Sequence, residues 1–166
     1  MISYQQILLN KILSRHEIAQ RANIWRMFNQ RIIFTNGCFD ILHQGHVEYL
    51  SKAKDFGNKL IIGLNTDGSV KRQNKSPERP INNEQSRAFI LASLGIVDAV
   101  VLFDEDTPYD LIKAVQPDVL VKGADWKVED IVGYDIVKAR GGEVASIEFT
   151  PGFSTTAIIQ KITSGK

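Results

Sequence analysis

The sequence predicts an α/β protein built on a Rossmann-like, doubly wound parallel sheet of about five strands. Short runs of β-branched and aromatic residues alternate with stretches of helical spacing along the chain after Gln30. The run at residues 59–65 is apolar over most of its length, which is typical of a parallel strand that is covered on both faces. Because this order of elements favours right-handed crossovers, we expect the strands to point the same way.

The chain of 166 residues is most simply one α/β domain preceded by a helical segment. Residues 1–30 form this segment, since Ile2 to Asn29 read as helical. Ser14 and Glu17 stand in capping-box order and divide the segment into two helices. We expect it to pack on the domain formed by residues 31–166 or to pair subunits.

Within the domain, apolar runs, glycines and capping residues place the elements in order. The expected strands are 31–34, 59–65, 99–103, 119–122 and 144–149. The expected helices, two of which end at glycines, are 47–54, 83–94, 107–115, 133–140 and 155–162. Polar residues 65–72 are expected as a loop at the carboxyl end of a strand, where open α/β sheets bind ligands, and residues 73–82 as an irregular loop.

Composition and charge exclude several classes of protein. With 43% hydrophobic and 23% charged residues, the chain is typical of a soluble globular protein, and its net charge of +1 gives no general attraction for nucleic acid. No apolar run approaches the ~18 residues of a membrane span, and no signal-peptide pattern is found. We therefore expect a cytoplasmic protein with no nucleic-acid or membrane partner.

The single cysteine, Cys38, fits a small buried hydrophobe better than a nucleophile.

The most informative stretch runs from Phe34 to His46 and joins a strand to a helix through a turn that contains Gly37. His43 and His46 would sit at the amino end of the helix, where unpaired backbone N–H groups and the helix dipole favour an anion. The stretch therefore predicts a phosphate site. Surface histidines and a zinc site are alternatives, but no Cys or Glu cluster supplies the remaining ligands of a closed zinc site, so we expect no resident metal.

This stretch resembles the His-x-Gly-His signature of the nucleotidyltransferase superfamily, whose members join a nucleoside triphosphate to a phosphorylated small molecule and release pyrophosphate. The matching positions are Gly37, Phe39, Asp40, His43, Gly45 and His46. The resemblance implies that Gly45 leaves room for the nucleotide. It also implies that the two histidines bind the triphosphate and the charge that develops on its α-phosphate.

Two later stretches match the same superfamily in order and spacing. Residues 121–126 stand where relatives approach the base and ribose, and residues 152–159 resemble a triphosphate-binding Phe-Ser-Thr-Thr signature. Read alone, the first is a polar turn and the second an ordinary Ser/Thr helix cap. Many cytidylyltransferases carry Arg-Thr-Glu-Gly before this signature, whereas residues 149–152 are Phe-Thr-Pro-Gly, which disfavours the CTP-specific branch.

The residues and the resemblance together predict three groups of site residues. The catalytic group, which would contact phosphates, is His43, His46, Lys71 and Arg87. The nucleotide-binding group is Asn36, Gly37, Cys38, Phe39, Asp40, Gly45, Lys122, Gly123, Asp125, Ser154, Thr155 and Thr156. The substrate-binding group is Asn65, Asp67, Arg72 and Arg79. Taken singly, each basic residue among them is more often a solvated surface charge.

Residues 31–162 most closely resemble the D-glycero-β-D-manno-heptose 1-phosphate adenylyltransferase family. The residues that carry the resemblance are 35–43, 65–67, 70–72, 79–80, 105–108, 121–123 and 154–156. The resemblance implies transfer of AMP from ATP, with Mg²⁺, to this sugar 1-phosphate. The products would be pyrophosphate and ADP-heptose for lipopolysaccharide core synthesis. It also implies a homo-oligomer, a dimer or larger, and a separate sugar kinase that supplies the sugar phosphate.

Other functions stay open at this point. They are a glycerol-3-phosphate-type cytidylyltransferase, a flavin or pantetheine adenylyltransferase, and a non-catalytic nucleotide-binding module. A class I aminoacyl-tRNA synthetase fragment shares the histidine motif, but this short, nearly neutral chain has no Lys-Met-Ser-Lys-Ser type loop.

Overall fold

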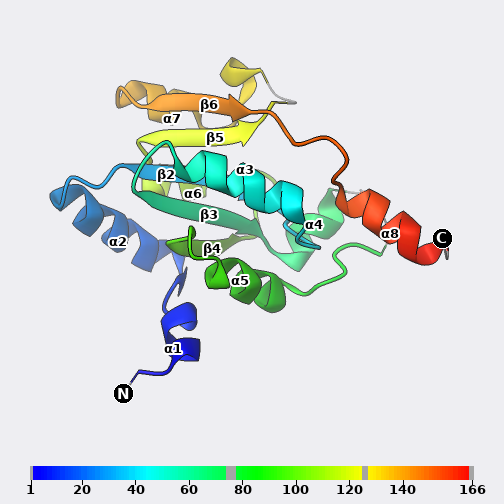
Figure 1. The fold of residues 1–166 in the computed structure, drawn as a ribbon. Helices are drawn as coiled ribbons and strands as arrows, with labels where there is room; N and C mark the ends of the chain where they lie inside the picture. Colours follow the sequence, from blue (N-terminus) through cyan, green and yellow to red (C-terminus); the bar gives the residue numbers. More distant parts are fainter. Residues whose placement is uncertain (1, 74–77, 125–126, 165–166) are drawn as a thin grey trace.

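The computed structural model describes residues 2–73, 78–124 and 127–164 and shows one parallel sheet with helices on both faces (Figure 1). The described chain contributes six strands in the order β1-β4-β3-β2-β5-β6. Counted from β2 onward, the order is 3-2-1-4-5, as in Rossmann-like sheets. The predicted fold class is confirmed, with one strand more than expected. The strands are β1 (Ile12–Leu13), β2 (Ile32–Gly37), β3 (Lys59–Asn65), β4 (Ala99–Phe103), β5 (Val119–Gly123) and β6 (Glu143–Ile147).

Helices connect the strands, and side-chain caps begin several of them. Ser14 Oγ accepts from the backbone N–H of Glu17, whose carboxylate accepts in return from the backbone N–H of Ser14, so the predicted capping box begins the second helix. No helix in the described ranges is both long and apolar enough to cross a bilayer. The helices are α1 (Tyr4–Leu9), α2 (Arg15–Met27), α3 (Gln44–Lys54), α4 (Asp67–Arg72), α5 (Glu84–Ser93), α6 (Tyr109–Val115), the 3₁₀ helix η1 (Val128–Asp130), α7 (Tyr134–Ala139) and α8 (Thr155–Thr163).

The N-terminal segment departs from the helical pattern predicted for residues 2–29. Between α1 and α2, residues 12–13 form β1 and pair in parallel with residues 100–101 of β4. The edge of β4 would otherwise present unpaired backbone groups, which even a two-residue strand can satisfy. The Lys11 ammonium group adds a hydrogen bond to the carbonyl oxygen of Val97 at 2.8 Å. The N-terminal segment therefore contributes a strand to the sheet in addition to its two helices.

Regular structure also extends further toward the carboxyl edge of the sheet than predicted. Residues 67–72, expected as a loop, form α4, because the hydroxyl of Thr66 caps the helix by accepting from the backbone N–H of Ser69 at 3.1 Å. β2 continues through Gly37, since its last two residues pair with residues 63–64 of β3. Part of the edge where the strands end is therefore built from regular hydrogen-bonded elements.

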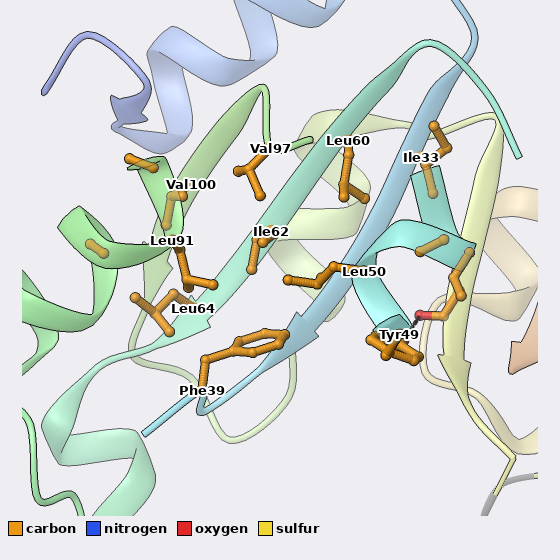
Figure 2. Packing of buried hydrophobic residues seen from close by; sticks show 14 of the residues in the cluster. Ile33, Phe39, Tyr49, Leu50, Leu60, Ile62, Leu64, Leu91, Val97 and Val100 are labelled. Atoms are coloured by element: carbon orange, nitrogen blue, oxygen red, sulfur yellow. Dashed lines mark hydrogen bonds between the residues drawn. The ribbon is translucent and has the colours of Figure 1, made fainter. Parts of the chain in front are cut away.

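The core has two layers, one on each face of the sheet. Along β2, Ile33 belongs to the core cluster that includes residues of α3 and α5, whereas Ile32 and Phe34 belong to the cluster that includes residues of α2 and α6 on the opposite face. Figure 2 shows the first layer, in which Leu50 of α3 and Leu91 of α5 lie against β3. Burial on both faces explains why the central strands read as apolar runs.

We predict that Ile61→Ala lowers the free energy of unfolding by about 2–5 kcal/mol, because Ile61 is fully buried in β3 and its truncation leaves a cavity. Ile162→Ala is the matched control, since Ile162 is 72% exposed on α8, and it should change stability by about 0.5 kcal/mol or less. Urea unfolding followed by circular dichroism measures both variants. Equal losses in the two variants would contradict this arrangement of the core.

Candidate active site

A cavity of about 820 Å³ opens at the carboxyl ends of the central strands. In this topology ligands bind at that edge, where the strand order reverses on either side of β2. Every predicted nucleotide-binding residue lines the cavity except Asp125, which lies outside the described residues. The lining residues are Asn36, Gly37, Cys38, Phe39, Asp40, His43, Gly45, His46, Tyr49, Asn65, Gln73, Arg79, Asp106, Thr107, Pro108, Lys122, Gly123, Ile131, Val132, Phe149, Thr150, Phe153, Ser154, Thr155 and Thr156.

The turn after β2 holds a backbone conformation that few residues adopt. Phe39 has a φ of 43°, in the left-handed region that is unfavourable for residues other than glycine. Its ring is buried in the core layer of Figure 2 and lies against Gly37, where a Cβ atom would be 3.0 Å from the ring. Asp40 fixes the other side of the turn by accepting from the backbone N–H groups of Ile81 at 2.8 Å and Asn82 at 3.0 Å. Packing and hydrogen bonds together hold the turn.

The two histidines lie at the amino end of α3 and stack on each other. Their ring centroids are 3.9 Å apart with an angle of 22° between the planes. His43 is the N-cap residue of α3, yet its side chain makes no capping hydrogen bond. Phe39 lies beside His46, at 5.3 Å between ring centroids, and Phe153 lies beside His43, at 6.2 Å. Aromatic neighbours therefore fix both imidazoles while leaving their nitrogens available.

Three buried polar atoms of the cavity wall have no hydrogen-bond partner among the described residues. They are Oδ1 of Asn36 and the Nδ1 atoms of His43 and His46. Buried polar atoms in folded proteins are nearly always hydrogen-bonded. A cavity that gathers three unsatisfied ones is therefore a candidate site for a polar ligand.

Both histidines are neutral near pH 7. Burial, together with the nearby His43 and Arg79, lowers the pKa of His46 to about 4. Burial also lowers the pKa of His43. Each neutral imidazole has one donor and one acceptor nitrogen. The pair therefore offers hydrogen bonds to a ligand without carrying charge.

The N-terminus of α8 forms the opposite wall. Gly45 lets it approach, because a Cβ atom at residue 45 would lie 2.9 Å from Cβ of Phe153 and 3.2 Å from Nδ1 of His43. Ser154 caps α8 by accepting from the N–H of Ala157 at 3.0 Å. The two helices α3 and α8 thus direct their positive ends toward one cavity.

The structure does not bring two of the predicted residues, Arg87 and Asp67, to the cavity wall. The Arg87 side chain is fully buried and donates to the Asp67 carboxylate at 2.7 Å. It also donates to the carbonyl oxygens of Cys38 at 2.6 Å and Asn82 at 2.9 Å. In this position the guanidinium group joins three chain segments behind the cavity.

Two other predicted basic residues, Lys71 and Arg72, lie in an adjoining cavity of about 700 Å³ that shares Gln73 and Asp106 with the large one. Arg72 pairs with Asp106 at 2.9 Å. Lys122, in the large cavity, donates to the carbonyl oxygen of Asn36 at 3.3 Å.

Several lining residues were not among the predicted site residues. Residues 106–108 follow β4, so the rule that ligands bind at strand carboxyl ends could have identified them. Tyr49 stands one helical turn after His46, on the same face of α3. Ile131 and Val132 carry no signal in the sequence.

Comparison with known proteins agrees with this fold. The cytidylyltransferase-like family model matches residues 34–161. The crystal structure of the lipopolysaccharide core biosynthesis protein from Thermoplasma volcanium is 29% identical, with a TM-score of 0.59 over 73% of this chain and 97% of that chain. Pantoate-β-alanine ligase from Francisella tularensis has the same TM-score at 18% identity, covering 89% of this chain and 75% of that chain, and shows likeness of fold alone.

Curated relatives share more of the sequence. The bifunctional protein HldE of Wolinella succinogenes is 53% identical over 160 residues, which cover 96% of this chain and 33% of that protein. The bifunctional protein HldE of a Nitratiruptor species is 58% identical over 135 residues, covering 81% and 28%. The chain therefore spans about a third of the length of these relatives. From the match over most of its length, the chain belongs to the cytidylyltransferase-like family.

Proposed function

We propose that this chain is an adenylyltransferase that transfers AMP from Mg-ATP to D-glycero-β-D-manno-heptose 1-phosphate, forming ADP-heptose and pyrophosphate. The observation that carries the proposal is the stacked pair of neutral histidines, whose unsatisfied Nδ1 atoms lie in a cavity of nucleotide size. Family membership supports the class of reaction. The resemblance of residues 31–162 to heptose 1-phosphate adenylyltransferases supports the acceptor.

In this reaction a phosphate oxygen of the sugar 1-phosphate forms a bond to the α-phosphorus of ATP. The bond between that phosphorus and the oxygen that bridges to the β-phosphate breaks, and pyrophosphate leaves. The nucleophile is already an anion near neutral pH, so no strong general base is needed. Catalysis therefore depends on alignment and on stabilising the charge of the transition state.

The residues of the cavity suit these two tasks. His43 and His46 would donate hydrogen bonds to phosphate oxygens from fixed positions. The start of α8, residues 154–156, would hold the β- and γ-phosphates through hydroxyl and backbone N–H groups. Lys71 and Arg72, in the adjoining cavity, would meet the phosphate of the sugar.

Mg²⁺ would enter as part of the substrate Mg-ATP. No group of three His, Cys, Asp or Glu side chains among the described residues is placed to hold a metal ion. Mg²⁺ commonly binds through substrate phosphates and waters with few protein ligands. The cation would neutralise charge on the triphosphate.

The relatives support the biological setting of the proposal. The Thermoplasma volcanium protein is named for lipopolysaccharide core biosynthesis, and the curated relatives are named as bifunctional. We place this chain in the same kind of pathway, in the cytoplasm where ATP is available. A sugar kinase would supply its acceptor, and the chain would act as a homo-oligomer.

The test is pyrophosphate release with Mg-ATP and with Mg-CTP, each with sugar 1-phosphates and with glycerol 3-phosphate. We expect release with ATP and D-glycero-β-D-manno-heptose 1-phosphate. The second candidate, a glycerol-3-phosphate-type cytidylyltransferase, is favoured only by the family description and predicts release with CTP. Absence of release from every pair would overturn both and leave a nucleotide-binding module.

We predict that His46→Ala lowers kcat by about 10²–10³-fold, because one preorganised donor to the transition state is lost. The fold should persist, which circular dichroism can verify. His16→Ala is the matched control, since His16 is exposed on α2, far along the chain from the cavity residues. Unchanged turnover in His46→Ala would contradict the proposed role of His46 in stabilising the transition state.

We predict that the protein loses stability as the pH falls from about 6.5 toward 4. An unfolded imidazole has a pKa of about 6.5, whereas burial, together with the nearby His43 and Arg79, lowers the pKa of His46 to about 4 in the folded chain. Between these values the unfolded state binds more protons, so the free energy of unfolding decreases as the pH falls. In His46→Asn the urea midpoint should fall less over this range than in the unmodified chain. Parallel pH curves for the two proteins would contradict the lowered pKa.

A further inference from the structure

Asp40 is a buried carboxylate whose two oxygens are both occupied by one short segment, residues 79–82. Its side chain is inaccessible to solvent. Oδ1 accepts from the backbone N–H groups of Ile81 and Asn82, and Oδ2 accepts from Nε of Arg79 at 3.1 Å. The carboxylate therefore has little capacity left for a nucleotide, although the sequence motif placed Asp40 among the nucleotide ligands.

Arg79 both bonds to Asp40 and lines the cavity. It lines the large cavity, and its side chain is 11% exposed. In the described part of the chain, Asp40 is its one hydrogen-bonding and ion-pair partner, through Nε alone. Because Nε is held, the guanidinium plane is oriented while its two terminal amino groups stay available for a ligand.

Arg79 differs from most other basic side chains near the cavity in its availability to a ligand. The two histidines that share the cavity wall with Arg79 are neutral near pH 7. Arg87 is fully buried behind the cavity, and Arg72 pairs with Asp106 in the adjoining one. A triphosphate in the large cavity would therefore meet Arg79 and Lys122 as its permanent cations.

We propose that Arg79 is a catalytic residue that binds phosphate oxygens of the nucleotide beside the histidine pair, and that Asp40 is its positioning residue. The inference rests on the proposed nucleotidyl transfer and adds a cation to it. A planar guanidinium held at Nε can present two parallel N–H donors to phosphate, which a lysine cannot reproduce. Arg87 supports the same segment from behind by donating to the carbonyl oxygen of Asn82 at 2.9 Å.

The experiment is a double-mutant cycle on Arg79→Gln and Asp40→Asn, with binding of inorganic pyrophosphate and of Mg-ATP measured by calorimetry. We expect Arg79→Gln to weaken pyrophosphate binding by about 10–100-fold, the range for a lost hydrogen bond to a charged group. Asp40→Asn keeps the size of the side chain and an oxygen acceptor, and it should weaken binding in the same direction. Because Asp40 acts through Arg79, adding Asp40→Asn to Arg79→Gln should cost little more.

Two further variants keep the result unambiguous. Arg79→Lys retains the charge without the planar fork and should recover only part of the affinity. Arg21→Gln removes a charge from the exposed side of α2 and is the control, with unchanged binding expected. Urea midpoints of all variants show whether the chain still folds. Native affinity in Arg79→Gln, or losses that simply add in the double variant, would overturn the proposal.

Turnover separates this inference from the proposed function. In Arg79→Gln we expect kcat for pyrophosphate release to fall as well as the affinity for ATP, because the cation would also meet charge in the transition state. If the unmodified chain binds pyrophosphate through Arg79 yet releases none with any nucleotide and sugar phosphate, the proposed function fails and the binding role stands. If release occurs and is insensitive to Arg79→Gln, the inference fails and the proposed function stands.

Discussion

Two buried side chains of opposite charge, Asp40 and Arg87, hold the segments from which the cavity is built. Arg87 bonds to the turn after β2, to the start of α4 and to Asn82, and Asp40 bonds to residues 79–82. A charge that is buried without its partners costs several kcal/mol, so removing one contact endangers the others. These segments lie far apart in the sequence, and they adopt one common arrangement because the buried charges require it.

Much of the fold could be predicted because its signals are local. Apolar runs, capping residues and glycines mark the strands from β2 to β6 and most helices within a few residues. The two main surprises, β1 and α4, are short elements with weak periodicity. The strand β1 exists because the edge of β4 is there to pair with, and α4 exists because Thr66 caps it and Val70 packs beneath it. Such elements depend on partners that a sequence pattern does not reveal.

The candidate site could likewise be predicted only where its signals are local in the sequence. A motif of fixed spacing placed His43, Gly45 and His46 at one helix end, because four consecutive residues leave little freedom of position. Topology likewise placed Arg79 and Arg87 near one edge of the sheet. Spacing and topology do not determine which way a side chain points, however. Arg87 turns into the protein to satisfy backbone carbonyl groups, and Arg79 lines the cavity. That distinction depends on tertiary contacts alone.

The unsatisfied atoms of the cavity connect stability with binding. Leaving a buried polar atom without a partner costs about 1–3 kcal/mol, and Asn36, His43 and His46 each contribute one such atom. The folded chain bears this cost because the atoms are held by a sheet, a strained turn and stacked rings that cannot relax around them. A phosphate ligand would accept hydrogen bonds from the imidazole N–H groups, whereas Oδ1 of Asn36 would need a donor such as a hydroxyl or amino group of the nucleoside. The rigidity that costs free energy in the ligand-free protein therefore preorganises the site for its ligand. Preorganised hydrogen bonds stabilise charge most effectively where water is excluded.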